Sequence, residues 1–151
     1  MPSLRIEFHT TFRTAGPHDL DWVLDTDPIG RADKRRNGFL QRGVDDRRCE
    51  LAVDAETPLG FAIWHRQFFS RPFLALLMVA PTARRRGVGS ALVGHVARKL
   101  ASEDRFFAST NASNEAAQRL FARLGFRRCG TIEEIDPGDP EWIYVLERVP
   151  S

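Results

Sequence analysis

The segment whose residue types most clearly indicate a chemical role runs from Arg84 to Ser90, where three arginines precede two glycines. An apolar stretch leads into it, and apolar residues at helical spacing follow it. The first turn of a helix presents unpaired N–H groups and the positive end of the helix dipole. Glycines let an anion approach the backbone, and arginines add positive charge. The segment therefore predicts a pyrophosphate-binding loop, although a solvated basic turn between a strand and a helix has the same composition.

The spacing of the two glycines separates this loop from two other nucleotide-binding loops. No Lys-Ser or Lys-Thr pair follows Gly89, so the loop is not of the Walker type. The third glycine of a dinucleotide fingerprint is missing, and the preceding strands look antiparallel.

A second chemical feature is the concentration of acids between Glu133 and Glu141, five in nine residues, in a chain with a net charge of +2. Such a loop attracts cations, and an alkyl amine is protonated in water because its pKa lies near that of lysine, about 10.4. We predict that Glu141 anchors or deprotonates an amine, directly or through one water. A solvated turn is the alternative, and His65 is the next candidate for the base.

Hydrophobic periodicity predicts the elements that position these residues. The longest apolar run, from Phe73 to Ala80, is apolar on both faces and predicts a central, buried strand up to Val79. Proline- and glycine-containing turns join it to the strands before it as an antiparallel meander. Predicted strands cover 3–14, Glu50–Val53, Leu59–Phe69, Phe73–Val79, Arg105–Ala108, Phe126–Ile132 and Trp142–Glu147, and predicted helices cover Asp19–Leu24, Arg31–Arg42 (ended by Gly43), 88 to about 101, and Asn114–Leu124.

Composition sets the class of protein. A chain of 151 residues with 42% hydrophobic and 28% charged residues fits one soluble domain, 1–151. No apolar run reaches membrane-spanning length, and the first residues have no signal-peptide core, so we expect a cytoplasmic protein without a membrane partner. The cysteines and histidines do not form a metal-binding pattern. Cys49 and Cys129 lie far apart and predict two free thiols, and four scattered histidines predict no metal site. The arginine clusters come without a nucleic-acid motif, so no nucleic-acid partner is expected.

Two segments resemble a known family. Arg84 to Gly89, directly after Val79-Ala80-Pro81, resembles the Arg/Gln-x-x-Gly-x-Gly/Ala signature of GCN5-related N-acetyltransferases (GNAT). Asn114 to Phe126 is similar to the Asn-x-x-Ala-x-x-x-Tyr-x-x-x-Gly-Phe segment of the same family. The two motifs cover residues 73 to 126, and the predicted order of elements fits the family over nearly the whole chain.

The resemblance implies an α/β fold with a mixed, mainly antiparallel twisted sheet flanked by helices. It also implies acetyl-CoA as cosubstrate, no metal, and a primary amine of a small molecule or peptide as acceptor. In this family the central strand splays from the next one, and the pantetheine arm of the cosubstrate lies in the gap. Residues expected to bind it are Leu77, Met78, Val79, Arg84, Arg85, Arg86, Gly87, Val88, Gly89, Ser90, Asn114 and Phe121.

One position departs from the family pattern. Phe121 stands where the family usually has the tyrosine that protonates the departing thiolate, and phenylalanine cannot donate a proton. Ser109 is the nearby candidate for this role, with strand-end structure as its alternative, and Tyr144 is expected in the core. Because of this departure, a non-catalytic acyl-CoA-binding module stays open as the alternative function. The resemblance also allows a homodimer. The apolar part of the acceptor pocket has four aromatic candidates, most of which core packing explains more simply, namely Trp64, Phe68, Phe69 and Trp142.

Overall fold

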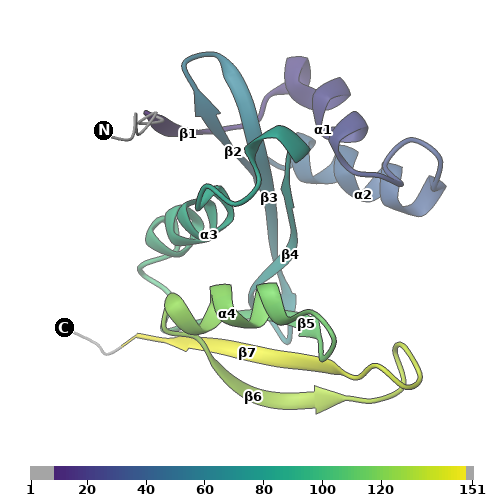
Figure 1. Ribbon diagram of the computed structural model, residues 1–151, viewed down its shortest axis with the longest axis vertical. Helices are drawn as coiled ribbons and strands as arrows, with labels where there is room; N and C mark the ends of the chain where they lie inside the picture. The colour runs from purple at the N-terminus through teal and green to yellow at the C-terminus, as the bar shows by residue number, and fades with distance from the viewer. Residues whose placement is uncertain (1–8, 149–151) are drawn as a thin grey trace, which may run out of the picture.

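The computed structural model describes residues 9–148 and contains a seven-stranded sheet with helices on both faces (Figure 1). The strand order is β1-β2-β3-β4-β5-β7-β6. All neighbouring strands are antiparallel except β4 and β5, which confirms the mixed, mainly antiparallel α/β sheet. The strands are β1 (Thr10–Thr14), β2 (Cys49–Asp54), β3 (Thr57–Phe68), β4 (Arg71–Val79), β5 (Arg105–Asn111), β6 (Arg127–Ile132) and β7 (Glu141–Glu147).

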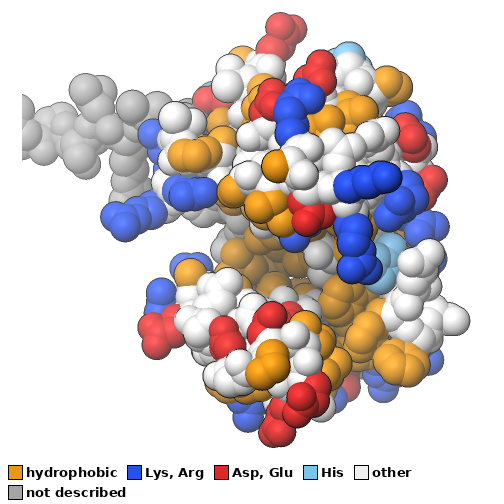
Figure 2. All heavy atoms as spheres, turned by 90° about the vertical axis from the view of Figure 1, so that its right-hand side faces the viewer, with side chains coloured by type: hydrophobic (Ala, Val, Ile, Leu, Met, Phe, Trp, Pro, Cys, Tyr) orange, Lys and Arg blue, Asp and Glu red, His pale blue; other side chains and the backbone are white. Residues whose placement is uncertain are grey.

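The sheet opens between β4 and β5. These strands share a single register pair, Phe73 with Phe107, whereas β5 and β7 share seven. Beyond this pair the two strands diverge, and β1–β4 and β5–β7 form two halves of one sheet (Figure 1). The surface is deeply hollowed between the two halves, and hydrophobic side chains lie at the bottom of the hollow (Figure 2).

Each face of the sheet has its own core. Helices α3 (Val88–Lys99) and α4 (Glu115–Arg123) cover one face, where buried residues of both sheet halves pack together. Helices α1 (Leu20–Thr26) and α2 (Lys34–Asp45) cover the other face, and the buried residues packed there all come from residues 15–63. Two short 3-10 helices, η1 (Pro17–Asp19) and η2 (Pro81–Ala83), precede α1 and α3.

The predicted bounds of the second helix were wrong. It begins at Lys34 because Asp33 caps it, accepting a hydrogen bond from the Arg36 amide at 2.8 Å. It continues through Gly43 to Asp45. A Cβ on Gly43 would lie 2.9 Å from the Ile63 side chain, so this glycine lets the helix pack closely on β3 instead of ending it.

The strand prediction for 73–79 was right in place and wrong in burial. Only Pro72 and Leu74 of β4 are buried, and the following residues are half-buried because β5 diverges from them. Strand β5 also extends to Asn111, three residues beyond its predicted end. The first predicted strand covers Thr10–Thr14, and its residues 3–8 lie outside the described part of the chain.

Both cysteines are free thiols, as predicted. Cys49 is buried, and burial, together with the nearby Glu50 and Asp19 carboxylates, raises its pKa to about 12. Its thiol therefore stays protonated and unreactive near neutral pH. Cys129 is exposed on β6.

The close approach of β3 to β4 depends on Gly60. A Cβ there would lie 2.7 Å from the Met78 carbonyl oxygen, which is backbone and cannot rotate away. We predict that Gly60→Ala lowers the free energy of unfolding by about 1–3 kcal/mol, measured by urea denaturation. The control is Gly94→Ala inside α3, where the Cβ has ordinary contacts and should raise stability by about 0.5–1 kcal/mol. Equal midpoints for the two variants would contradict the analysis.

Candidate cofactor and acceptor site

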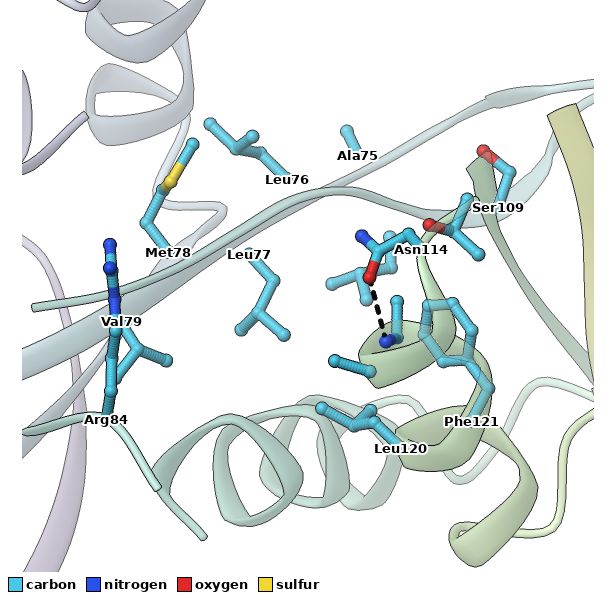
Figure 3. A pocket seen from close by; sticks show the side chains of 14 residues that line it. Ala75, Leu76, Leu77, Met78, Val79, Arg84, Ser109, Asn114, Leu120 and Phe121 are labelled. Atoms are coloured by element: carbon cyan, nitrogen blue, oxygen red, sulfur yellow. Dashed lines mark hydrogen bonds between the residues drawn. The ribbon is translucent and has the colours of Figure 1, made fainter. Parts of the chain in front are cut away.

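A cavity of about 750 Å³ occupies the opening between β4 and β5, with α4 on one side (Figure 3). Strand β4 contributes one wall, and the end of β5 and the first turns of α4 contribute the other. The lining is mainly apolar, with four polar side chains. The lining residues are Leu74, Ala75, Leu76, Leu77, Met78, Val79, Arg84, Ser109, Thr110, Asn114, Ala116, Ala117, Leu120 and Phe121.

A bulge in β4 decides which side chains enter each side of the cavity. Ile63 and Trp64 of β3 pair with Leu76 and Leu74, so Ala75 is an extra residue. After the bulge, Leu77 and Val79 pack with the core under α3 and α4. Leu76 and Met78 pack with the core under α1 and α2 (Figure 3).

The free edge of β4 can bind an extended chain. Residues 74–79 pair with β3 on one side and have no register partner in β5 on the other. The backbone N–H and C=O groups that point into the opening are therefore available to a ligand, as at any strand edge.

The basic loop meets this edge at the start of α3. It turns through Arg85 and Gly87, both left-handed with φ of 64° and 76°. Gly87 is the N-cap of α3, and no side chain caps the helix there. A Cβ on Gly87 would meet nothing within 4 Å, so the backbone faces open space. The Arg84 side chain lines the cavity (Figure 3), and the geometry suits a phosphate group.

Helix α4 presents small and apolar side chains to the cavity at helical spacing. Ala116, Ala117, Leu120 and Phe121 lie on this face. Asn114 caps the helix, because its Oδ1 accepts a hydrogen bond from the Ala117 amide at 3.1 Å (Figure 3). Only its Nδ2 group remains to donate to a ligand.

Residues 6–126 match the model of the Acetyltransferase (GNAT) family. The chain belongs to the GNAT family. It is 37% identical over 123 residues to a phosphinothricin N-acetyltransferase of Streptomyces coelicolor, covering 75% of this chain and 71% of the relative. Among solved structures, a GNAT-family acetyltransferase of Bacillus cereus matches with a TM-score of 0.82 and 32% identity, over 93% of this chain and 99% of that one. Arabidopsis thaliana NAA60 in complex with acetyl-CoA shares the fold, with a TM-score of 0.76 and 22% identity over 92% and 99% of the two chains.

The residues predicted to bind the cosubstrate divide into two groups in this GNAT chain. Side chains of the first group line the cavity: Leu77, Met78, Val79, Arg84, Asn114 and Phe121. Side chains of the second group lie outside its lining, so only their backbone groups or exposed ends can contribute: Arg85, Arg86, Gly87, Val88, Gly89 and Ser90. Val88 is 5% exposed and packs in the core, which leaves only its amide for a ligand.

Phe121 is a packing residue at the edge of the cavity. It is 4% exposed, and its ring lies 5.3 Å from Phe126 and 5.1 Å from Tyr144. Burial raises the pKa of Tyr144, against a smaller opposite effect of Arg128. Tyr144 does not line the cavity, whereas the Ser109 side chain does (Figure 3).

The acidic loop is fastened to the turn between β5 and α4. Asp139 accepts hydrogen bonds from the Ser113 amide at 3.0 Å and from the Ser113 hydroxyl at 2.6 Å. Asp136 accepts one from Asn111 Nδ2 at 3.0 Å, and the Ala112 amide donates to the Pro140 carbonyl. Two of the five acids therefore shape the loop.

Glu141 lies at the start of β7, on the same face as Ser109. It pairs with Asn111, and Ile143 pairs with Ser109, so all four side chains share one face. The opposite face carries Tyr144, which packs under α4. Glu141 is half-buried and lies outside the cavity lining. It is the diagonal neighbour of Ser109 across the β5–β7 pair, which places their Cα atoms roughly 7–8 Å apart.

His65 stays further from the opening. It lies on β3, its ring stacks on Phe73 at 5.5 Å, and its Nδ1 accepts a hydrogen bond from the Gln67 amide at 3.0 Å. Burial, and secondarily the charge of Arg48, lowers the pKa of His65, so the ring is neutral near pH 7. It does not line the cavity.

Sequence reasoning missed the bulge at Ala75 and the small residues of α4. The bulge leaves no composition signal, because an apolar run looks the same with or without it. Ala116 and Ala117 lie one turn before Leu120 and Phe121, and this spacing could have assigned them to the same face. No group of three or more metal-ligating side chains occurs within residues 9–148, and none of the helices there is long and apolar enough to span a membrane.

Removing the Asp139 carboxylate should loosen the turn before α4. We predict that Asp139→Ala lowers the free energy of unfolding by about 1–2 kcal/mol, because two donors on Ser113 lose their acceptor. The Ser113 amide should also exchange faster with deuterated water. Glu134→Ala is the control, an exposed acid of the same loop that should change stability by less than about 0.5 kcal/mol. Unchanged Ser113 exchange in Asp139→Ala would contradict this role.

Proposed function

We propose that this GNAT chain transfers an acetyl group from acetyl-CoA to a primary amine of a small molecule or peptide. The observation that carries the proposal is the cavity itself. It is lined by Arg84, which lies three residues before the uncapped start of α3 at Gly87, and by the free edge of a splayed strand. The first feature suits a pyrophosphate and the second an extended amide-containing arm. The named activity of the Streptomyces coelicolor relative supports N-acetyl transfer.

The chain offers a distinct group to each part of acetyl-CoA. Amides from Arg86 to Ser90 and the Arg84 side chain hold the phosphates. Backbone groups from Leu77 to Val79 hydrogen-bond the pantetheine amides, and the Asn114 Nδ2 group donates to the same arm. Leu120 and Phe121 cover its apolar part. Holding thioester and amine together supplies rate by proximity.

The reaction forms one bond at the carbonyl carbon and breaks another, and it moves one proton off the nitrogen and one onto the sulfur. The neutral amine nitrogen attacks the thioester carbonyl carbon, the carbon–sulfur bond breaks, and the sulfur leaves as a thiolate. Glu141 takes the proton from the nitrogen through a water, because it lies outside the cavity lining. Ser109, whose side chain lines the cavity, supplies a proton to the sulfur and regains one from solvent.

The alternative function is acyl-CoA binding without catalysis. Phe121 favours it, since this ring occupies the family's usual tyrosine position and has no proton to give. The two functions differ in one measurement. An enzyme releases CoA from acetyl-CoA when it is mixed with a panel of amines, whereas a binding module does not.

We call the loop from Arg84 to Ser90, with the start of α3, the phosphate cradle, and its role predicts a selective loss of CoA binding when Gly87 is changed. We expect Gly87→Ala to weaken CoA binding at least tenfold by calorimetry, because the new methyl group lies where a phosphate approaches. Gly125→Ala is the matched control. Gly125 is also left-handed (φ 90°) and ends α4, so both variants lose stability of order 1 kcal/mol. Weaker CoA binding in both variants, or in neither, would count against the cradle.

The proposed base predicts a pH-dependent defect. Glu141→Gln should lower kcat/KM for the amine about a hundredfold and leave the affinity for CoA unchanged. Glu134→Gln, an exposed acid of the neighbouring loop, should match the parent protein. The measurement is a pH–rate profile of all three proteins. Overlay of the Glu141→Gln profile on the parent profile would remove Glu141 from the mechanism and direct attention to His65.

A further inference from the structure

Three phenylalanines form a continuous aromatic surface at the closed end of the opening. The Phe68 ring lies 4.9 Å from Phe73 with an interplanar angle of 25°, and 5.1 Å from Phe107. His65 extends the surface by stacking on Phe73. All three phenylalanines are half-buried, so each ring keeps area for a further contact. We call Phe68, Phe73 and Phe107 the aromatic shelf.

The shelf lies beside the proposed reaction site. Phe73 and Phe107 are the single pair of β4 and β5, so they lie where the opening begins. Ser109 follows Phe107 by two residues on the same strand face, a rise of about 6–7 Å. Ser109 lines the cavity, so the shelf begins two residues before the cavity lining on the same strand.

The shelf lies on the sheet face opposite the proposed cosubstrate site. Phe106 and Ala108 are buried under α3 and α4, so Phe107 and Ser109 point to the other face. A bulge brings Phe68 to this face as well. His65 pairs with Phe73 and Phe68 with Arg71, so β3 has one extra residue between the two pairs.

No helix of the described chain covers this part of the sheet. The buried residues under α1 and α2 come from residues 15–63, and none belongs to β5, β6 or β7. Because the proposed cosubstrate contacts the start of α3 and α4 on one face, an acceptor must reach the opening from the other. The shelf, Ser109 and Glu141 all lie on that face.

We propose that the acceptor is a primary amine with an aromatic or bulky apolar body, which packs on the aromatic shelf while its nitrogen lies beside Ser109. Aromatic rings gain from stacked or tilted contacts in addition to area burial. The amine end meets the polar part of the same face, where Ser109 and the Glu141 carboxylate lie. This inference rests on the proposed acetyl transfer and specifies its acceptor.

Kinetics with two amines test the acceptor class. With acetyl-CoA saturating, 2-phenylethylamine should have a kcat/KM at least tenfold above that of ethanolamine. Phe107→Ala should raise KM for 2-phenylethylamine about tenfold or more, with little change in kcat, in KM for acetyl-CoA, or in kcat/KM for ethanolamine. Ile29→Ala is the control, because Ile29 is an exposed apolar side chain in the connection between α1 and α2 and should change none of these values.

Two further measurements keep the test decisive. Phe107→Leu is the substitute variant if Phe107→Ala does not fold, and its KM for 2-phenylethylamine should lie between those of the parent and Phe107→Ala. Binding of 2-phenylethylamine to the CoA-bound protein, followed by saturation-transfer NMR, does not depend on turnover and should be lost in Phe107→Ala.

The outcomes distinguish the two proposals. Failure of every amine to release CoA, with 2-phenylethylamine still bound on the shelf, overturns acetyl transfer and keeps the apolar-amine site. Equal or better use of ethanolamine, or equal effects of Phe107→Ala on both amines, overturns the apolar acceptor and keeps acetyl transfer. A change of oligomeric state in Phe107→Ala with unchanged KM values would show that a second copy of the chain covers the shelf.

Discussion

The single pairing of Phe73 with Phe107 is the constraint on which the site depends. A strand inside a sheet has neighbours on both edges, and its backbone groups pair with them. Here β4 and β5 meet once and then diverge, although both lie in the middle of the strand order. The interior edge of β4 is thereby exposed to a cavity of about 750 Å³. Both halves of the sheet contribute to the cavity, and neither half would form it alone.

The opening persists because one core spans it and the other does not. Phe106 of the second half and Ala62 of the first half share the core under α3 and α4 with Leu92 and Val96, which holds the halves together on that face. Gly89 supports this arrangement, since a Cβ there would lie 3.2 Å from the Leu120 side chain. Helices α1 and α2 pack only on the first half. In the described chain, the buried cluster under these two helices does not extend to β5 and β7.

Charged side chains hold two connecting segments of the chain in place. Asp27 is buried and accepts a hydrogen bond from Arg36 at 2.6 Å, which fastens the connection between α1 and α2. Asp139 fastens the opposite loop to the turn before α4. Two acids of the cluster between Glu133 and Glu141, Asp136 and Asp139, thus have partners within the chain. Glu141 differs from them because it starts β7 and shares a sheet face with Ser109, which lines the cavity.

The sequence by itself determined the local elements, including the glycine-containing loop before α3. Glycine spacing, arginines and helical periodicity are local signals, and they located α3, α4 and the loop between Arg84 and Ser90. Helix bounds failed at Gly43, where packing against Ile63 overrides the usual preference of glycine for helix ends. Only the tertiary structure decided which strands separate, where the bulges turn Leu76 and Phe68, and which face each acid meets. These properties depend on register between distant segments, and a shift of one residue reverses the face of every side chain without changing local composition.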